Sequence, residues 1–392
     1  MPMNPERELA ELANGSLLRR RRVAGSPCGP EMLIDGQPTV SFASNDYLGL
    51  ANHPAVINAA AEGARRWGAG AGASHFLGGH FRPHEELEER LAAFVGAGRA
   101  LLFSTGYMAN LGVVPALAGR GGAVFSDRLN HASLIDAVRL SGAKSHRYPH
   151  LDMAALESRL AASAAKEKAI LTDAVFSMDG DVAPLPELAA LAERFGAWFV
   201  GDDAHGFGVL GPQGRGTLAH FGMRPTGRRL LMGTLGKAAG VAGAFVAGDA
   251  DVVEWLAQKA RTAIYTTAAP PMLSCALLKS LDLVEASDGR RARLHALIAR
   301  LRAGLGPVCA RTGWRLPSSS AAIQTPIQPL VIGGNRETLA VADALLSRGV
   351  WAPAIRPPTV PEGAARLRVS LSAAHADEHV DRLIDALSDY AR

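Results

Sequence analysis

The chain has 392 residues, of which 48% are hydrophobic and 20% are charged. This composition is typical of a compact soluble protein and excludes a largely disordered one. Basic side chains exceed acidic ones by 41 to 37, and a net charge of +4 is too small to indicate a nucleic-acid partner. The one local basic cluster is the run of four arginines at 19–22, which fits either a solvated helix face or a site for an anion.

The cysteines and the N-terminal residues bear on the compartment. Cys28, Cys275 and Cys309 lie far apart and form no CxxC pair, so we expect neither a disulfide framework nor a structural zinc or other metal site. The first residues carry charges where a secretory signal would have its apolar region. No stretch of about 18 apolar residues occurs, so no membrane span is expected. We therefore expect a cytoplasmic protein.

The first two thirds of the chain show the pattern of a large α/β domain over residues 46–280, after a helix and an irregular arm over residues 1–45. Short unbroken apolar runs alternate there with amphipathic helical segments, as strands buried on both faces of a mostly parallel sheet do. One helix is expected to begin at Pro83, with an apolar stripe of Leu87, Leu91, Phe94 and Val95. The strand-like runs lie at residues 100–103, 123–125, 169–176, 198–200, 230–232 and 244–247.

The C-terminal part changes character. Residues 281–305 suit a long connecting helix rich in Leu, Ala and Arg. The residues after it alternate strand and helix on a smaller scale, so residues 281–392 are predicted to form a linking helix and a small α+β domain. The expected elements are a strand at 323–332, a helix from Asn335, a strand at 366–370 and a closing helix with Val380, Leu383, Ile384 and Leu387 on its buried face.

Residues 68–74, Gly-Ala-Gly-Ala-Gly-Ala-Ser, invite comparison with a dinucleotide-binding loop. The glycine spacing does not fit G-x-G-x-x-G, and the preceding segment looks like a helix rather than a strand. We interpret the segment as a tight glycine-rich turn.

Lys237 follows an apolar strand-like run and two glycines, in a neighbourhood of Gly and Ala. Apolar surroundings disfavour an ammonium ion and free an amine for attack on a carbonyl group. Taken alone, the segment fits an ordinary lysine at a turn better than a reactive one.

Asp202 ends the apolar run 198–200 and lies where a parallel strand should reach the ligand-binding edge of the sheet, with His205 shortly after it. A carboxylate at this position suits the ring nitrogen of pyridoxal phosphate (PLP), which must be protonated to withdraw electrons from a substrate carbanion. A simple turn is the alternative, and a metal pair is disfavoured because no third ligand follows in register.

Residues 104–107 form a turn from a strand into a helix, and backbone N–H groups at a helix start bind phosphate readily. His131 follows the next strand and could lie over an aromatic cofactor ring, although a helix-capping segment would look the same.

Taken in order, these segments resemble those of fold-type-I PLP enzymes, and within them the α-oxoamine synthases. The similarity runs from about residue 17 to the C-terminus. It implies a PLP-dependent transferase with a large α/β domain, built on a mostly parallel seven-stranded sheet, plus a small C-terminal α+β domain. The motifs that carry it lie at residues 44–50, 104–107, 127–133, 176–180, 202–206 and 234–237.

The resemblance also implies roles for individual residues. Lys237 attaches the cofactor and later removes the Cα proton of the amino acid, Asp202 keeps the ring nitrogen protonated, and His131 stacks on the ring and contacts the substrate. These three are the expected catalytic residues. The other expected cofactor-binding residues are Ser177 and His205 at the phenolic oxygen, and Gly106, Tyr107 and Thr234 at the phosphate.

Within the family, residues 354–361 and the arginine run are most similar to the branch that condenses L-alanine with a pimeloyl thioester of coenzyme A or acyl-carrier protein. This reaction gives 8-amino-7-oxononanoate, CO2 and the free carrier in biotin biosynthesis. The similarity implies that Arg356 binds the amino-acid carboxylate and Arg19 the acyl donor, tasks suited to a guanidinium group. Asn45 and Pro353 complete the expected substrate-binding residues.

Two positions depart from the family's pattern. Pro353 stands where a threonine often precedes the Ala-Ile-Arg motif, and proline offers neither a hydroxyl nor an N–H. Ala71 and Ala73 replace two residues of a segment that often reads Gly-Ser-Gly-Gly-Ser. Both departures bear on the acyl-chain preference.

Two rival interpretations remain open. A sibling α-oxoamine synthase would use glycine or serine with another acyl-CoA. A PLP-fold protein kept for binding alone would be expected to have lost Lys237, Asp202 or His205, and all three are present. Enzymes of this fold build their sites between two subunits, so the resemblance also implies a homodimer.

Overall fold

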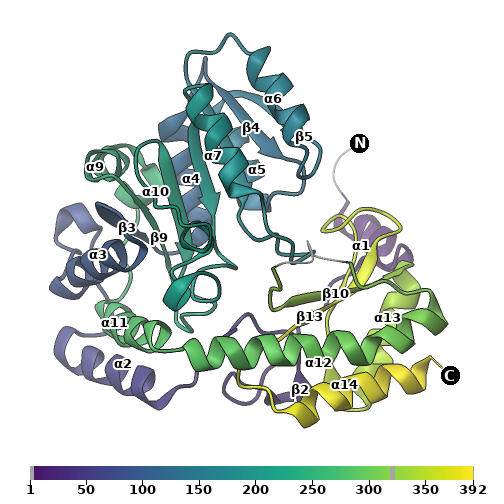
Figure 1. The fold of residues 1–392 in the computed structure, drawn as a ribbon. Coiled ribbons are helices and arrows are strands. Elements are labelled where there is room, and N and C mark those ends of the chain that lie inside the picture. Colours follow the sequence, from purple (N-terminus) through teal and green to yellow (C-terminus); the bar gives the residue numbers. More distant parts are fainter. Residues whose placement is uncertain (1–3, 318–322, 392) are drawn as a thin grey trace. The chain divides into compact units, whose positions relative to one another are not determined.

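The computed structural model describes residues 4–317 and 323–391, which form two compact units (Figure 1). The large unit consists of residues 50–177 and 181–288. The small unit consists of the described residues among 1–49, 178–180 and 289–392. The structure therefore groups the N-terminal residues with the C-terminal ones. The domain boundaries predicted after residues 45 and 280 stay a prediction.

The large unit is built on a sheet of β3 (Arg99–Phe103), β4 (Ala123–Asp127), β5 (Lys144–Tyr148), β6 (Lys168–Asp173), β7 (Trp198–Asp202), β8 (Arg229–Thr234) and β9 (Ala244–Gly248). The spatial order is β3-β9-β8-β7-β6-β4-β5. β9 pairs antiparallel with β3 and β8, and the remaining pairs are parallel. The predicted mostly parallel, seven-stranded sheet is confirmed.

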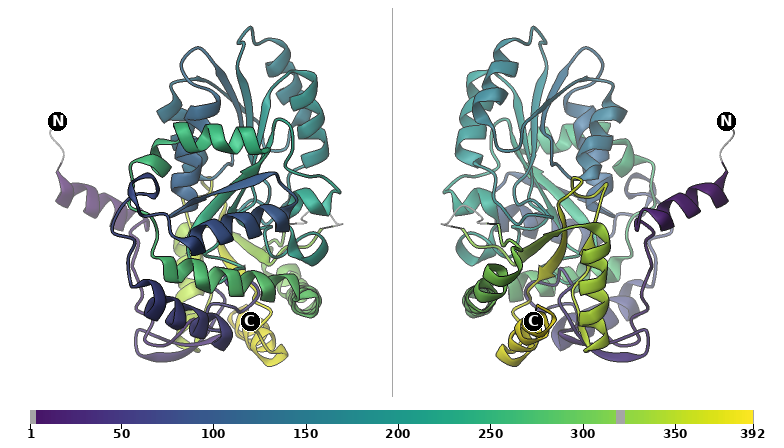
Figure 2. Two further views of the ribbon diagram at one scale, coloured as in Figure 1. Left: turned by 90° about the vertical axis from the view of Figure 1, so that its left-hand side faces the viewer. Right: turned by 90° about the vertical axis from the view of Figure 1, so that its right-hand side faces the viewer.

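Helices of the large unit lie on both faces of this sheet (Figure 2). Every residue of β4 and β9 is buried, which explains why these strands are unbroken apolar runs rather than alternating ones. The helices are α2 (Pro54–Trp67), η1 (His75–Leu77), α3 (Arg82–Val95), α4 (Gly106–Leu117), α5 (Ala132–Ser141), α6 (Met153–Ala161), α7 (Leu185–Arg194), η2 (Pro212–Gly214), α8 (Thr217–His220), α9 (Ala250–Lys259), α10 (Arg261–Ile264) and α11 (Pro271–Glu285).

Two details of the large unit bear on the sequence predictions. The strand β5 is missing from the predicted runs because it lies at the sheet edge and reads Lys-Ser-His-Arg-Tyr, with one buried residue. The glycine-rich segment 68–74 follows the helix α2 and contains no strand, as expected, and Gly68 and Gly72 adopt positive φ there.

The small unit contains α1 (Pro5–Asn14), β1 (Glu31–Ile34), β2 (Gln37–Ser41), α12 (Asp288–Thr312), β10 (Ile327–Gly333), α13 (Asn335–Ser347), β11 (Val350–Trp351), β12 (Ala354–Ile355), β13 (Ala365–Ser370) and α14 (Asp377–Tyr390). One three-stranded sheet has the order β10-β13-β12 and the other β1-β2-β11. Val380, Leu383 and Leu387 of α14 are buried as predicted, and Ile384 is half-buried.

The structure corrects two predictions in this region. The expected irregular arm contains the β1–β2 hairpin, whose turn residues Asp35 and Gly36 both have positive φ. An Asp-Gly pair between short strands is a hairpin signal that the sequence does carry. The expected single helix over residues 281–305 is two helices, because α11 ends at Glu285 and α12 begins at Asp288.

None of the helices in the described chain is long and apolar enough to cross a membrane. The three cysteines are unpaired.

Packing between β8 and β9 predicts the effect of enlarging Gly233. Gly233 pairs with Phe245, and a Cβ atom on Gly233 would lie 2.5 Å from Cε1 of that ring. We expect Gly233→Ala to lower the free energy of unfolding by about 1–3 kcal/mol, since overpacking forces the ring off its rotamer. Denaturant titration followed by fluorescence measures this change.

The matched control is Gly306→Ala, in α12, where a Cβ atom would meet nothing within 4 Å. This variant should be unchanged or more stable by up to about 1 kcal/mol, because alanine is the better helix former. Equal destabilisation by the two variants would contradict the packing argument.

Candidate active site

The carboxyl ends of the parallel strands meet at one edge of the sheet, where open α/β sheets bind ligands. β4 ends at Asp127, β6 at Asp173, β7 at Asp202 and β8 at Thr234, while β3 leads to the start of α4 at Gly106. Polar and charged groups from distant parts of the sequence are therefore brought together by strand pairing alone.

A cavity of about 210 Å³ lies at this edge. All eight predicted catalytic and cofactor-binding residues line it, and they come from five different strand–loop segments. These residues are Gly106, Tyr107, His131, Ser177, Asp202, His205, Thr234 and Lys237. Residues that the sequence analysis did not single out also line it, namely Ser133, Asp173, Val175, Ala204 and Met232.

Lys237 lies in the turn after β8, which is closed by a hydrogen bond from the Gly240 N–H to the Lys237 carbonyl at 2.8 Å. Its Nζ lies 2.9 Å from Nε2 of His205. His205 is buried and Lys237 is half-buried, so the amine is held at the cavity wall with its direction fixed by the imidazole. Such a positioned amine suits covalent attachment to a carbonyl compound.

Asp202 is buried at the end of β7, with both carboxylate oxygens accepting hydrogen bonds. The Ala204 N–H donates to Oδ1 at 3.1 Å, and Asn110 Nδ2 donates to Oδ2 at 2.8 Å. The same Asn110 Nδ2 donates to Ser133 Oγ at 2.9 Å. The carboxylate is thus fixed in orientation by groups from α4 and from its own turn.

Asp173 is a second carboxylate, paired with Asp202 in the β6–β7 register. The two residues are 3% and 5% exposed. Burial raises the pKa of Asp173 well above its usual range, and the negative charge of Asp202 raises it further. Two neighbouring buried carboxylates do not both ionise readily, so the raised pKa of Asp173 favours its protonated form.

His131 caps the N-terminus of α5 and lines the cavity. Its Nδ1 accepts the Ser133 N–H at 3.2 Å and lies 2.7 Å from Ser133 Oγ, so the hydroxyl hydrogen points to the ring. Burial lowers the pKa of His131, and the positive charge of Lys237 adds to this effect against the opposing charge of Asp202. The lowered pKa favours the neutral imidazole, in which Nδ1 is an acceptor.

The start of α4 lines the cavity through Gly106 and Tyr107. The Thr105 side chain caps the helix by accepting the Met108 N–H at 3.1 Å. A Cβ atom on Gly106 would lie 2.7 Å from Cγ2 of Thr234, so glycine is required for the close approach of this helix to β8. The Tyr107 hydroxyl donates to Asp136, and the raised pKa of Tyr107, caused first by this bond, keeps the hydroxyl protonated.

These groups fit PLP part by part. The cavity offers an amine for the aldehyde, a carboxylate for a protonated ring nitrogen and a helix N-terminus for the phosphate. His205 and Ser177 line the same cavity as polar groups for a phenolic oxygen.

Apart from His131, the predicted substrate-binding residues are four, and they lie in the small unit. Arg356 donates to the carbonyl groups of Ser16 and Leu18, and its buried Nε has no hydrogen-bond partner within residues 4–317 and 323–391. Burial lowers the pKa of Arg356, and the nearby charge of Arg19 lowers it further. Arg19 Nη2 donates to Thr359 Oγ1 at 3.4 Å, so both guanidinium groups lie by the 354–361 motif.

Asn45 and Pro353 form hydrogen bonds within the small unit. Asn45 Oδ1 accepts hydrogen bonds from the Tyr47 hydroxyl at 3.1 Å and from Arg368 Nη1 at 3.0 Å. The carbonyl of Pro353 accepts the Arg368 N–H at 2.9 Å. Both residues therefore position Arg368. Asn45 does so from within the 44–50 motif, and Pro353 from just before the 354–361 motif.

Sequence reasoning missed Asp173, Asn110 and Ser133. Asp173 does carry a signal, because it ends a buried apolar strand as Asp202 does. Ser133 ends the 127–133 motif but received no role, and Asn110 carries no signal. Both act through one bridge between α4, α5 and Asp202 that only the folded chain creates.

Comparison with known proteins identifies relatives along the whole chain. Residues 37–387 match the family "Aminotransferase class I and II". The chain is 61% identical to the 8-amino-7-oxononanoate synthase of Herminiimonas arsenicoxydans, with 97% of each chain covered. An equal identity of 61%, over 97% of this chain and 95% of the relative, relates it to the enzyme of the same name from Azoarcus sp..

Solved structures agree with the fold. The serine palmitoyltransferase of Sphingomonas wittichii superposes with a TM-score of 0.89 at 31% identity, covering 98% of this chain and 95% of that one. The 8-amino-7-oxononanoate synthase of Francisella tularensis superposes with a TM-score of 0.76 at 29% identity, covering 90% and 97%.

The contact between Gly106 and Thr234 predicts a clash that can be relieved. Gly106→Ala should push the start of α4 from β8 and weaken PLP retention about tenfold or more, given an overpacking cost of about 1–3 kcal/mol. Adding Thr234→Ser removes the opposing methyl group but keeps the hydroxyl, and should restore binding. Equilibrium dialysis of PLP measures both variants, with Thr234→Ser alone as control. A double variant as weak as Gly106→Ala would contradict the proposed contact.

Proposed function

The chain belongs to the aminotransferase class I and II family and, within it, to the 8-amino-7-oxononanoate synthases, and from this membership we propose the reaction of its active site. It joins L-alanine to a pimeloyl thioester and releases CO2 and the free thiol carrier. The product is 8-amino-7-oxononanoate, for biotin biosynthesis. The protein is a PLP-dependent acyltransferase that acts on small-molecule substrates.

One observation carries this proposal. The chain is 61% identical, over 97% of its length, to an 8-amino-7-oxononanoate synthase, and its cavity brings together the lysine, the carboxylate and the helix N-terminus that PLP requires. A binding protein without catalytic activity would have no use for an amine fixed 2.9 Å from a buried imidazole.

Serine palmitoyltransferases give the second candidate, because one of them superposes with a TM-score of 0.89. Overlap of backbones reports the shared fold and not the substrate. The identity of 31% to that enzyme is half of the 61% to an 8-amino-7-oxononanoate synthase, and this difference favours alanine and pimeloyl substrates.

Lys237 would hold the cofactor through Nζ, and its free amine would serve as the base for the Cα proton of alanine. PLP, when bound, supplies a carbonyl group for amine attachment and a ring that withdraws electrons from the Cα atom. His205 Nε2 orients the lysine amine, and Ser177 and His205 would be the polar groups for the phenolic oxygen. The N–H groups at the start of α4, with Gly106 and Thr234 in close contact, would hold the phosphate.

Asp202 carries the negative charge that keeps the ring nitrogen protonated. Asn110 and the Ala204 N–H fix its orientation, and the protonated Asp173 next to it avoids a second charge. His131, held neutral and oriented by Ser133, stacks on the ring and contacts the substrate.

Substrate recognition is assigned to the guanidinium groups of the small unit. Arg356 binds the carboxylate of alanine, for which its unpartnered Nε provides a donor, and Arg19 binds the acyl donor. Asn45 and Pro353 line the substrate. Bond formation between the alanine Cα and the acyl carbon breaks the thioester C–S bond, and loss of CO2 follows.

We also propose a cytoplasmic homodimer. The segments η1 and α10 are in contact. Leu77, the last residue of η1, is 80% exposed, and Tyr265, which directly follows α10, is 71% exposed. Large apolar side chains exposed together suit a contact with a second copy of the chain. Three unpaired cysteines suit a reducing compartment. Coenzyme A and acyl-carrier protein are both candidate carriers of the pimeloyl group.

The pair of carboxylates predicts unequal effects of equivalent substitutions. Asp202→Asn should lower kcat about 10²-fold or more, because it removes the charge at the ring nitrogen. Asp173→Asn should keep kcat within a few-fold of the parent enzyme, since asparagine resembles the protonated acid. Steady-state kinetics at neutral pH measures both. A larger loss in Asp173→Asn than in Asp202→Asn would reverse the assignment of the charge.

The proposed reaction is tested by mass spectrometry of the products from PLP-loaded protein, L-alanine and pimeloyl-CoA or pimeloyl-acyl-carrier protein. We expect 8-amino-7-oxononanoate, and a loss of about 10³-fold or more in Lys237→Ala, which lacks both the attachment point and the base. Parallel reactions contain glycine or serine with palmitoyl-CoA. Turnover only in those would reassign the substrates, and turnover by Lys237→Ala at the parent rate would refute the role of the lysine.

A further inference from the structure

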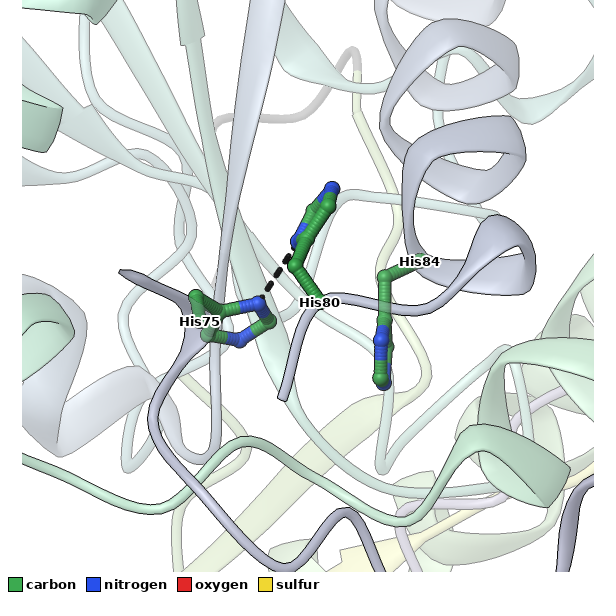
Figure 3. Close-up of side chains that lie close together, drawn as sticks. All are labelled: His75, His80 and His84. Carbon is green, nitrogen blue, oxygen red and sulfur yellow. Dashed lines mark hydrogen bonds between the residues drawn. The ribbon is translucent and has the colours of Figure 1, made fainter. Parts of the chain in front are cut away.

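Three histidines outside the cavity form a cluster at the start of α3 (Figure 3). His75 lies in η1, His80 lies just before α3, and His84 lies in the first turn of that helix. One ligand atom from each residue lies within 4.8 Å of those of the other two. From this convergence we propose that His75, His80 and His84 form a binding site for one divalent transition-metal ion of the cobalt, nickel and zinc type.

The ring positions fit three imidazoles around a metal. Their centroids are 5.0 Å, 5.2 Å and 5.7 Å apart. A tetrahedral ion with metal–nitrogen distances of about 2.0 Å places the centroids of its imidazole ligands roughly 5 Å apart. The cluster therefore has the dimensions of a metal site before any ion binds.

Hydrogen bonds to two of the rings show which nitrogen of each carries the lone pair. His84 Nε2 lies 2.8 Å from the Ala269 carbonyl, which can only accept, so the proton is on Nε2 and the lone pair on Nδ1. His80 Nε2 lies 2.8 Å from Glu85 Oε2, which assigns its lone pair to Nδ1 in the same way. Histidines that bind metals are oriented in the same way, since the ring nitrogen away from the metal donates its N–H to a carbonyl or a carboxylate.

His75 and His80 face each other through their Nδ1 atoms, 2.7 Å apart. With the lone pair of His80 on Nδ1, one proton from His75 occupies the contact. A metal ion takes the place of this proton, which moves to Nε2 of His75, and the two nitrogens then open to about 3.3 Å, the separation at a tetrahedral ion. At His84 the ion takes the lone pair that accepts the Phe81 N–H at 3.0 Å.

The chain around the cluster combines a fixed part with an adjustable one. His84 is fully buried and anchored to α3 and Ala269, whereas the His80 side chain is 28% exposed and can follow the ion. The turn between His75 and His80 is tight, because Gly79 donates to the Ser74 carbonyl at 2.9 Å and a Cβ atom there would lie 2.1 Å from the Ala73 carbonyl oxygen. Imidazole ligands alone suit cobalt, nickel, copper and zinc and disfavour calcium and magnesium.

Isothermal titration of the PLP-loaded, untagged protein with Co²⁺ and with Zn²⁺ tests the proposal. We expect one equivalent to bind, with the Co²⁺ complex showing visible absorption of a tetrahedral site. A variant carrying His75→Asn and His80→Asn should lose at least about 100-fold in affinity, and Glu85→Gln about 10–100-fold. His84 is left intact because its Nδ1 accepts the Phe81 N–H at the start of α3.

The matched control is His220→Asn, which removes an exposed histidine of the same unit. It should bind the ions as the parent protein does, and any ion held by the cofactor is common to all variants. Circular dichroism checks that each variant is folded. Equal affinity in the double variant and the His220→Asn control, or no stoichiometric binding in the parent, would overturn the proposed site. Neither result depends on turnover of the proposed condensation reaction.

Discussion

Parallel pairing of β4, β6, β7 and β8 is the constraint on which the active site depends. Parallel strands all end at the same edge, so a polar residue placed at the end of each one reaches a common place without any long-range design of loops. Asp202, Thr234 and the start of α4 at Gly106 meet in this way around one cavity. The antiparallel β9 adds the packing surface that fixes β8 from the other side.

The same pairing creates an electrostatic conflict, because the register of β6 on β7 places Asp173 beside Asp202 in a buried edge. Unequal surroundings resolve it. Asp202 accepts hydrogen bonds from Asn110 and Ala204, while burial and the charge of Asp202 keep the proton on Asp173. A single negative charge in an apolar edge suits a protonated ring nitrogen better than two charges would, because a second carboxylate would compete for the same proton.

A chain of hydrogen bonds links the Asp202 carboxylate to the imidazole of His131, which lines the cavity. Asn110 bridges Asp202 and Ser133, and the Ser133 hydroxyl in turn faces His131. The orientation of the imidazole thus depends on the same groups that fix the carboxylate. The cluster of His75, His80 and His84 is separate from this network, since its contacts run to Glu85, Ala269 and Phe81.

Local sequence determined the strands with apolar runs, the helix from Pro83 and the closing helix. Burial on both faces leaves an unbroken apolar run in a strand, and burial along one stripe leaves a helical period. It also determined the residue types that PLP requires, since Lys237, Asp202 and His131 lie at strand ends, and the family resemblance gave them roles. The edge strand β5 left no such pattern, because water faces most of its side chains. The β1–β2 hairpin left only the Asp35-Gly36 turn signal.

Only the tertiary structure decided which of these groups touch. The 2.9 Å contact of Lys237 with His205, the Asp173–Asp202 pair and the Asn110 bridge each join residues from different segments. The histidine cluster likewise depends on a tight turn before α3 and on the carbonyl of Ala269, which is remote in sequence. Sequence supplies the chemical groups, whereas distances and dielectric surroundings, which set their reactivity, exist only once the strands have paired.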